Sequence, residues 1–416
     1  MKRLDWFIAR HYLRAGRGRG LLSLITWIAL GGFTLGVAAL IIVTSVVGGM
    51  QAEMRAKILE SMPHLHVLEW SSSLRLRDYE RVVDSIMSMD GVVAAAPFAL
   101  SNVTLILGDG DYSQAAYLFG VDMDPSQIAA TDMERQINDG TLSLDPPASG
   151  LPPLLLGVQL ANRMQAFPGD TLTIAAMENL SVNIMGMPAP ALRAFEVTGT
   201  FETGMYEYDL GNVYTTLEAA QELLGIPSTD ASGIGVRTGD ADLAAEMAET
   251  LSDRLGPGYS VESWITRNRA LFSALKLEKL ALGVIVFLIV IVAAFNIVST
   301  LVMVVSDRTK EIGILRTMGM TEESILRIFV LQGVWIGVIG TVVGTTLGVG
   351  ISWALDRFQL IRIPGDVYFV NYLPADLDPL YIALIVAASI SIAFLATIYP
   401  ARQASRLQPL DAIRHE

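Results

Sequence analysis

The sequence contains no cysteine and little charge. Without cysteine no disulfide can brace any part of the chain, so each folded part must be held by its hydrophobic core alone. Charged residues make up only 17% of the 416 residues and hydrophobic residues make up 52%. This composition is too apolar for a soluble domain of this length, so it predicts that part of the chain is buried in a membrane.

The sequence also lacks the motifs of common catalytic sites. It has no G-x-x-x-x-G-K-[ST] phosphate loop, no H-E-x-x-H zinc motif and no G-x-S-x-G nucleophile turn. Its four histidines are scattered, and although His64 and His66 would share one face of a strand, a lone pair of histidines is usually structural. We therefore expect no catalytic residue, no metal site and no cofactor bound by this chain.

Long apolar runs are the main feature that is present. Four segments of roughly 20 or more residues contain no Asp, Glu, Lys or Arg, and each can cross a hydrocarbon core of about 30 Å as a helix. They are Leu21–Gly48, Leu280–Ser306, Ile328–Leu355 and Pro379–Pro400. Because backbone groups in lipid must bond within their own segment, these segments predict four transmembrane helices.

The charges are distributed unevenly along the chain. Residues 50–272 hold 12 Lys and Arg against 30 Asp and Glu, a net charge of -18, whereas the remainder holds 17 against 12, a net charge of +5. Basic residues concentrate before the first span, between spans two and three, and after the fourth. The positive-inside rule then places both termini in the cytoplasm and the acidic block on the far side.

The acidic block alternates short apolar runs with Gly, Pro and Asp. We predict strands at 64–68, 103–107, 116–121, 171–174, 195–201 and 211–214, and helices at 78–89, 215–224 and 240–255. This mixture indicates an α+β or α/β domain with a core of its own.

Two segments allow two interpretations each. Residues 1–20 can form an amphipathic helix in the cytoplasmic interface or act as a basic flank that sets topology. The stretch Ala175–Ala194 is rich in Met, Pro and small residues, so we expect an irregular arm that binds a partner. The alternative is a long hairpin whose apolar residues fold back onto the domain core.

Small and polar residues interrupt the apolar spans. The first span carries Gly31, Gly32 and Gly36, and the third carries six glycines, Gly333, Gly337, Gly340, Gly344, Gly348 and Gly350. At spacings of three or four they favour close helix packing. Polar exceptions are few, among them Asn296, and no charge marks a path for ions or protons.

Three stretches together resemble a known permease family. They are FIARHYLRAGRGRGLLSLITWIALGGFTLGVAALI from Phe7, AAFNIVSTLVMVVSDRTKEIGILRTMG from Ala293, and IYPARQASRLQPLDAIRHE from Ile398. EIGILRTMG predicts a short helix that Gly319 ends, and it resembles the ATPase-coupling helix of four-span permeases related to MacB and FtsX. With the other two stretches, the chain resembles the lipoprotein-releasing permeases of the LolC/LolE type, with the hook-bearing LolC-like kind favoured.

The resemblance implies a polytopic α-helical membrane protein with four transmembrane helices and a large MacB-like α+β periplasmic domain. The expected parts are a cytoplasmic amphipathic helix (1–20), the first transmembrane helix (21–50), the periplasmic domain (51–272) with a hook arm at about 177–195, the second transmembrane helix (273–306), the cytoplasmic coupling helix (307–326), the third transmembrane helix (327–355), a periplasmic loop (356–378), the fourth transmembrane helix (379–400) and a cytoplasmic tail (401–416).

It also implies a function in the bacterial inner membrane. Such permeases take triacylated lipoproteins from the outer leaflet of this membrane and pass them to a LolA-like periplasmic carrier. A LolD-like ATPase binds ATP and Mg²⁺, and a second permease subunit, LolE-like or another copy of this chain, completes the transporter.

The resemblance points to three sets of residues. For ATPase coupling we expect Arg308, Glu311, Ile312, Leu315, Arg316 and Met318. For the carrier-binding hook we expect Met185, Met187, Pro188 and Pro190, with Arg163 and Arg193 as polar contacts. For a cavity that holds acyl chains we expect Val37, Leu40, Ile41, Val43, Val46 and Met50 of the first span, and Phe272, Leu275, Leu277 and Leu280 of the second.

One alternative function belongs to another class. In an FtsX-like transmitter, ATPase cycles move the outer domain to switch a cell-wall hydrolase, and nothing is transported. The hook-like arm and the closing YPARQASRLQP stretch favour the transporter.

Overall fold

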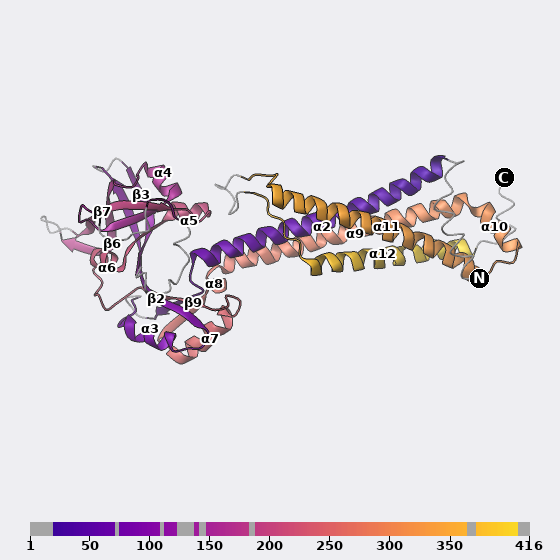
Figure 1. The fold of residues 1–416 in the computed structure, drawn as a ribbon. Coiled ribbons are helices and arrows are strands. Elements are labelled where there is room, and N and C mark those ends of the chain that lie inside the picture. The colour runs from indigo at the N-terminus through magenta and orange to yellow at the C-terminus, as the bar shows by residue number, and fades with distance from the viewer. Residues whose placement is uncertain are drawn as a thin grey trace. The chain divides into compact units, whose positions relative to one another are not determined.

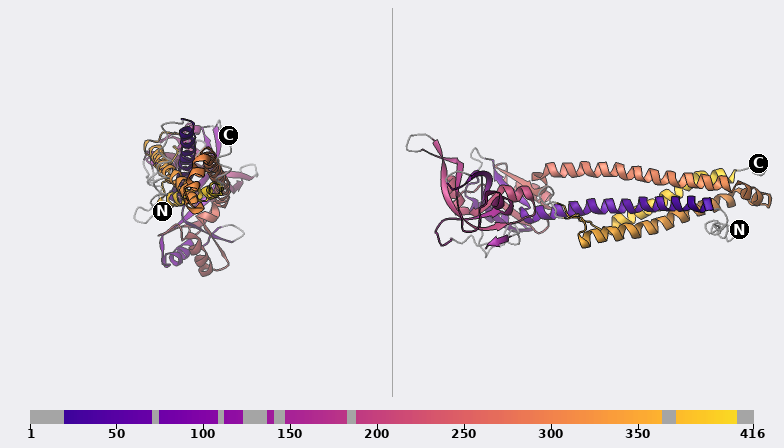
Figure 2. Two further views of the ribbon diagram at one scale, coloured as in Figure 1. Left: turned by 90° about the vertical axis from the view of Figure 1, so that its right-hand side faces the viewer. Right: turned by 90° about the horizontal axis from the view of Figure 1, so that it is seen from above.

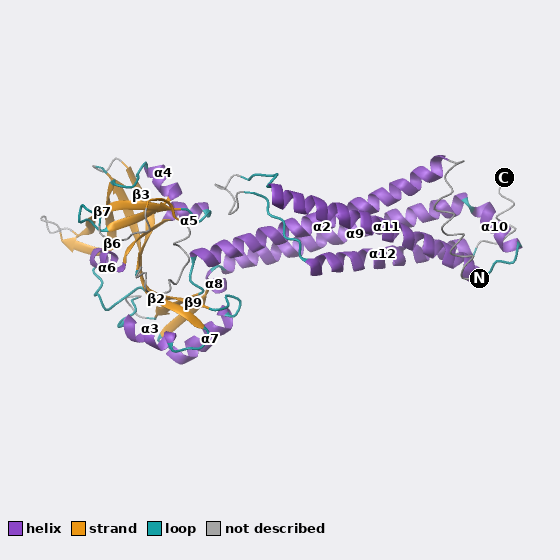
Figure 3. Cartoon of the chain, in the orientation of Figure 1, coloured by secondary structure: helices purple, strands orange, loops and turns teal. Residues whose placement is uncertain are grey.

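The computed structural model describes residues 20–70, 75–108, 112–122, 137–140, 147–182, 188–363 and 372–406. The chain divides into two compact units, shown in Figures 1 and 3. The first, here the membrane unit, comprises residues 1–52, 275–362 and 372–416, and the second, here the outer unit, comprises residues 53–274 and 363–371.

The membrane unit is built from long helices that lie side by side (Figures 1 and 2). Among the described residues, four helices are long and apolar enough to cross a membrane: α2 (Gly20–Ser61), α9 (Arg269–Asp307), α11 (Glu322–Phe358) and α12 (Pro379–Ser405). The prediction of four transmembrane helices is confirmed. Both α2 and α9 extend beyond their uncharged segments into the outer unit.

Glycines of α11 bring it close to its neighbours. A Cβ atom added at Gly344 would lie 2.7 Å from the carbonyl oxygen of Thr34 on α2, and one added at Gly348 would lie 2.9 Å from the Cβ of Ile41. Gly333 and Gly337 meet α12 in the same way, at Thr397 and Ala393. These glycines therefore act in helix packing, as their spacing predicts.

Helix α9 is packed much less than α11 within the chain. Only 6% of its most apolar 18-residue window is buried, against 50% in α11. Large side chains of α9 such as Phe287, Val292 and Phe295 are more than half exposed. Most of the α9 surface is thus left for lipid or for other molecules.

A short helix, α10 (Thr309–Thr317), connects α9 to α11. Gly319 follows it with φ of +92°, a conformation that glycine adopts readily, and ends the helix as predicted. The Thr321 hydroxyl then accepts a hydrogen bond from the Ser324 N–H and caps α11. The segment 307–326, expected as one coupling helix, therefore contains α10, a turn and the start of α11.

The outer unit is a mixed sheet covered by short helices. The sheet order is β10-β1-β9-β2-β3-β8-β5-β7-β4, and β6 pairs with β2 and β7. The strands are β1 (Leu65–Glu69), β2 (Val92–Leu107), β3 (Tyr112–Val121), β4 (Ile137–Gly140), β5 (Pro153–Gly157), β6 (Thr171–Val182), β7 (Pro188–Phe201), β8 (Asn212–Thr216), β9 (Gly233–Thr238) and β10 (Tyr259–Ser263). The helices are α3 (Tyr79–Met87), α4 (Val158–Met164), α5 (Tyr206–Gly211), α6 (Leu217–Leu224), α7 (Ala244–Leu255) and α8 (Trp264–Arg267).

All six predicted strands and all three predicted helices of this unit are present. The strands β4, β5, β9 and β10 and the helices α4, α5 and α8 were not predicted. In β5, Leu154 and Leu156 enter one hydrophobic cluster and Leu155 another, so the strand is apolar on both faces. Without alternation between apolar and polar residues, such a strand has no two-residue period to detect.

Two hydrophobic cores lie along the long strand β2. At one end Ala95 packs with residues of β1, β9, α3 and α7, and with Trp264 of α8. At the other end Ala99, Val103 and Leu105 pack with β3, β5, β6, β7, β8, α4 and α6. Figure 1 shows α3 and α7 near β9, and α6 near β6 and β7.

The described residues on both sides of 183–187 form two paired strands of a hairpin, so the prediction of an irregular arm is wrong for them. Strands β6 and β7 pair in antiparallel fashion from Thr171–Glu196 to Val182–Pro188, with an irregularity between Ala176 and Leu180. Pro188 and Pro190 are tolerated because this end of β7 has β6 as its only neighbour, so no second strand requires their missing N–H groups.

Candidate functional site

A groove between α2 and α9 is the main candidate site of the membrane unit. It has a volume of about 350 Å³, near the lower end of the range for small-molecule sites. Its lining consists of Gly32 and Gly36 of α2 and Ile285, Leu288, Ile289, Val292, Ala293 and Asn296 of α9. Seven of these eight residues have apolar side chains or none, so the groove suits a hydrocarbon chain.

The glycines of α2 create the space of this groove. At Gly36 an added Cβ atom would lie 3.9 Å from Ala293 and 4.0 Å from Ile289, so a larger side chain would extend into the groove. At Gly32 the side-chain amide of Asn296 occupies the position that a Cβ atom would take. Asn296 is thus the single polar side chain of the lining, in contact with α2.

The residues predicted for an acyl-chain cavity lie elsewhere on the same two helices. Val37 and Ile41 are buried against Gly344 and Gly348 of α11, so their assignment to a cavity is corrected: they pack the helices together. Phe272 is also corrected, because its ring packs edge to face on Trp264, 5.2 Å between centroids, in the outer unit. The apolar groove lies between other residues of α2 and α9.

The other seven predicted residues differ in exposure. Leu40 is buried, Val43, Val46, Met50 and Leu275 are half-buried, and Leu277 and Leu280 are exposed. Their contact with acyl chains stays a prediction. The signal that could have located the groove was already visible in the sequence, as the pair Gly32 and Gly36 with the lone Asn296.

Helix α10 exposes a different apolar face from the one predicted. Ile312 is 1% exposed and packs with Val304, Phe329 and Ala401, so it belongs to the core rather than to a docking surface. Ile314 and Met318, one helical turn apart, are 55% and 79% exposed. Leu315 is half-buried.

The charged residues predicted for ATPase coupling bind within the chain. Arg308 is buried and its Nη1 donates to Glu311 over 2.8 Å. Arg316 donates to the carbonyl oxygen of Ser405 over 3.1 Å and pairs with Glu322 over 2.9 Å. Arg316 therefore fixes α10 against its own neighbours, and Arg308 pairs within the first turn of α10. Contact of either arginine with an ATPase stays a prediction.

The hairpin of β6 and β7 combines a buried base with exposed apolar side chains. Ile174 and Ala176 are buried in the outer unit, whereas Met177 and Leu192 are 65% and 63% exposed. The hairpin therefore does not fold all its apolar residues back onto the core. The predicted contacts Met185 and Met187 lie outside the described residues.

Two polar residues fix the hairpin to α6. Asn179 Nδ2 donates to the carbonyl oxygen of Leu223 over 3.0 Å, and Arg193 Nη1 donates to that of Ala219 over 3.3 Å. Arg193 also pairs with Glu222, so it anchors the hairpin to α6, and its contact with the carrier stays a prediction. Arg163, at the end of α4, is exposed and stays a predicted contact.

One histidine of the outer unit has a strongly shifted pKa. Burial lowers the pKa of His66 from 6.5 to about 3, and the positive charge of Arg267 contributes. Its ring packs edge to face on Phe98, with 5.8 Å between centroids. Among the described residues no cluster of acidic residues, histidine and cysteine could hold a metal ion.

Two family models match the chain, and curated relatives match nearly all of it. Residues 26–254 match the MacB-like periplasmic core domain, and residues 283–409 match the FtsX-like permease C-terminal region. The chain is 32% identical to the lipoprotein-releasing system transmembrane protein LolC of Xylella fastidiosa, with 98% of both chains covered. It is 33% identical to LolC of Neisseria meningitidis over 99% of both chains, and 24% identical to LolE of Haemophilus influenzae over 98% of both.

Proposed function

Because this chain belongs to the LolC/LolE family of lipoprotein-releasing permeases, we propose that it takes lipoproteins from the outer leaflet of the inner membrane and passes them to a periplasmic carrier. It is a permease subunit of an ABC transporter for lipoprotein release. In this proposal both termini lie in the cytoplasm and the outer unit lies in the periplasm, as the basic residues beside the spans favour.

The observation that carries the proposal is the apolar groove between α2 and α9. Exposing an acyl chain to water costs about 0.8 kcal/mol per methylene, so three chains together cost tens of kcal/mol. A transporter for triacylated proteins therefore has to shield these chains during extraction. In our proposal the groove receives part of one chain, with Leu288 and Val292 as contacts.

The energy for extraction comes from a separate LolD-like ATPase in this proposal. The sequence has no phosphate loop of its own, so ATP and Mg²⁺ bind in the partner. The exposed pair Ile314 and Met318 on α10 supports a docking face for that partner. Arg316 joins the same helix to Glu322 of α11 and to the carbonyl oxygen of Ser405 on α12, and Ile312 packs on both helices, so a movement of α10 reaches the membrane helices.

A second permease subunit, LolE-like or another copy of this chain, would cover the exposed side of α9 in the proposed transporter. The exposed Phe287, Phe295 and Met303 of α9 give this helix a wide apolar surface. The groove of about 350 Å³ is by itself too small for three acyl chains. We propose that facing helices of the two subunits enclose the full set of chains.

The hairpin of β6 and β7 is the proposed hook for a LolA-like carrier. Its support is the exposure of Met177 and Leu192 on a rigid base that Asn179 and Arg193 tie to α6. Photocrosslinkers placed at these two exposed positions are expected to capture the soluble carrier in cells. Capture of a cell-wall hydrolase or its activator instead would favour the transmitter function.

Photocrosslinking from the groove tests the function directly. A photoreactive amino acid at Leu288 or Val292 should give adducts with a triacylated lipoprotein, and the adducts should disappear when ATP and carrier are added. Leu384 and Leu395 of α12, which are similarly exposed, serve as matched controls for contact with bulk lipid. Equal adducts at all four positions, or none at Leu288 and Val292, would contradict the proposal.

A further inference from the structure

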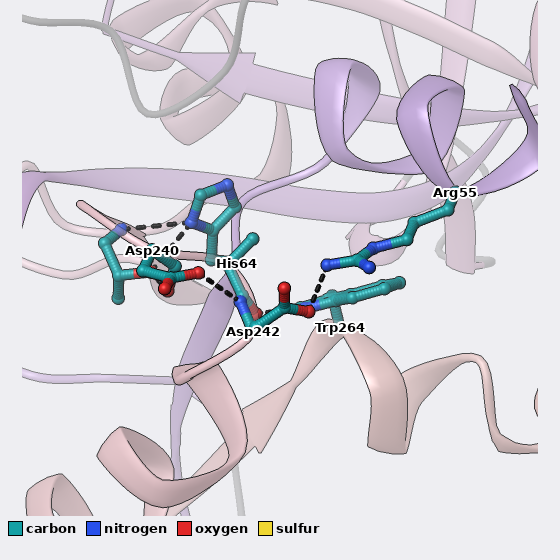
Figure 4. A network of polar contacts seen from close by, with 7 residues as sticks. Arg55, His64, Asp240, Asp242 and Trp264 are labelled. Atoms are coloured by element: carbon teal, nitrogen blue, oxygen red, sulfur yellow. Dashed lines mark hydrogen bonds and ion pairs between the residues drawn. The ribbon is translucent and has the colours of Figure 1, made fainter. Parts of the chain in front are cut away.

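The outer ends of the two helices that join the outer unit to the membrane unit are bound by one loop. Helix α2 ends at Ser61, and α8 precedes α9 by a single residue, Asn268. The loop of residues 238–243 begins at the last residue of β9 and leads to α7, and it contacts residues of α2 and α8 (Figure 4). All these residues belong to the outer unit.

Arg55 of α2 holds the loop from one side. Its guanidinium group pairs with the Asp242 carboxylate and lies over the indole ring of Trp264, 5.6 Å from the centroid. The backbone N–H of Asp242 donates to the Asp240 carboxylate over 2.8 Å, which orients the turn that carries Asp242. One cation on α2 thus contacts both the loop and α8.

Trp264 of α8 holds the same loop from the other side. Its Nε1–H donates to the carbonyl oxygen of Ala241 over 2.9 Å, and the side chain is 2% exposed. Its backbone N–H donates to the carbonyl oxygen of His64, three residues beyond α2, over 2.9 Å. A buried indole with its N–H bonded has little freedom to shift relative to the loop.

His64 and Thr238 complete the connection at the start of the loop. The backbone N–H of Thr238 donates to Nδ1 of His64 over 3.2 Å, and the Thr238 hydroxyl lies 2.8 Å from the same nitrogen. The Thr238 hydroxyl also donates to the carbonyl oxygen of Asp240 over 2.8 Å. The chain after α2, the loop and α8 therefore form one connected polar network.

We propose that Arg55, Asp242 and Trp264 form a clasp that positions α2 and α8 relative to each other during lipoprotein release. This proposal rests on the proposed function, because it assumes lipoprotein release. Its three residues lie outside the groove and outside the exposed face of α10. An exposed ion pair alone contributes little, and the side chains of Arg55 and Asp242 are 43% and 65% exposed. Here, however, the same guanidinium also lies on a buried ring, so the two helix ends are held together through one loop.

The clasp makes the two connections move as one body. If α2 shifts during the ATPase cycle, Arg55 carries the 238–243 loop with it, and the loop carries Trp264 and the start of α9. Without the clasp each helix can move alone, and ATP is hydrolysed without a matching displacement of the outer unit. Arg55, Asp242 and Trp264 are therefore positioning residues, whose loss lowers the lipoprotein released per ATP.

A charge-reversal cycle in the complete transporter tests the clasp. Glu60 and Ala270 are exposed near the two helix ends, and the chain has no native cysteine, so Glu60→Cys and Ala270→Cys can carry spin labels. Arg55→Glu and Asp242→Arg should each broaden the label-to-label distance distribution and lower the lipoprotein released per ATP about threefold. The double variant restores the ion pair with its charges exchanged but not the cation of α2 over Trp264, so it should recover both quantities in part.

Two further variants separate the clasp from general damage. Arg81→Glu reverses an exposed charge on α3 and should change neither quantity. Trp264→Phe keeps an aromatic ring but removes the N–H that Ala241 accepts, and should broaden the distances.

Unchanged distances and release in both single reversals would overturn the clasp. So would a double variant that recovers no part of either quantity. If the unsubstituted transporter released no lipoprotein at all, the proposed function would fail, and the distance distributions alone would still decide the clasp.

Discussion

Helices α9 and α11 differ in packing although they are alike in length and both can cross a membrane. They contain 39 and 37 residues, and both have an apolar stretch without charge that can cross a membrane. In α11 half of that stretch is buried within the chain, whereas in α9 only 6% is. The difference comes from the side chains at the contacts, since α11 presents a row of glycines and α9 presents Phe, Leu and Val.

The comparison separates two uses of an apolar helix. In α11, Gly340, Gly344 and Gly348 let the backbone of α2 approach closely, and the helix becomes part of the interior. In α9 the large side chains keep neighbours away and leave a groove beside Gly32 and Gly36. A packed helix gives the unit its stability, and an exposed one is free to bind other molecules.

The largest expected effect is on stability, at a packed glycine. Gly344→Leu should destabilise the membrane unit by about 2–3 kcal/mol, because its Cβ atom would collide with the backbone of α2. Gly283→Leu on α9 is the matched control, since no heavy atom lies within 4 Å of its Cβ position. Unfolding in mixed micelles measures both, and equal losses would remove the contrast between the two helices.

The next effect concerns the groove rather than stability. Gly36→Leu should fill the space between α2 and α9 and lower lipoprotein release about tenfold, equivalent to about 1.4 kcal/mol. Gly31→Leu on the same helix points into open space and should leave release unchanged. Release from reconstituted vesicles gives the measurement, and normal release by Gly36→Leu would show that the groove holds no substrate.

A smaller effect is expected on α10, where packed and exposed residues lie two positions apart. Ile314→Asp should place a charge in the ATPase contact and lower ATP-driven release about fivefold, while the fold is kept. Gln403→Asp adds the same charge at an exposed position of α12, outside this face, and serves as the control. Co-purification of the ATPase provides an independent measurement, and an undiminished complex with Ile314→Asp would exclude this face.

The smallest effect is a pH dependence in the outer unit. Because the pKa of His66 is about 3 when folded and 6.5 when unfolded, the unfolded chain takes up a proton below pH 6.5 and stability falls as the pH drops. Relative to pH 8, this contributes a loss of about 0.8 kcal/mol at pH 6. Hydrogen exchange of β1 amides measures it, and His66→Phe should lack this component. An identical pH dependence in the variant would assign the effect to other groups.

The predicted features were those with a short-range signal in the chain. Uncharged length predicted the four spans, alternation predicted strands such as β3 and β8, and Gly319 with Thr321 predicted the break between α10 and α11. The hairpin was only the alternative interpretation of this stretch, because Pro188 and Pro190 oppose strands in general. They are accepted here only because their end of β7 has a single neighbour.

The residues of the groove and of the α10 face were predicted less well. Val37 and Ile41 have the same chemistry as residues that line a cavity, and only the position of α11 shows that they are buried. Ile312 and Ile314 are likewise indistinguishable by type, and the position of Phe329 decides which of them is covered. When a helix is apolar on all sides, its sequence does not predict which side packs against other protein segments.

By itself, the sequence determined that the chain has four membrane helices, an acidic α+β domain with short alternating strands, and no disulfide. These properties follow from composition and local periodicity, which act within a few residues. The tertiary structure alone decided that α11 is interior and α9 exposed, that the groove lies at Gly32 and Gly36, and that Arg55 meets Asp242 and Trp264. Each of these depends on contacts between segments far apart in the chain, where the shape of one surface determines what can pack against another.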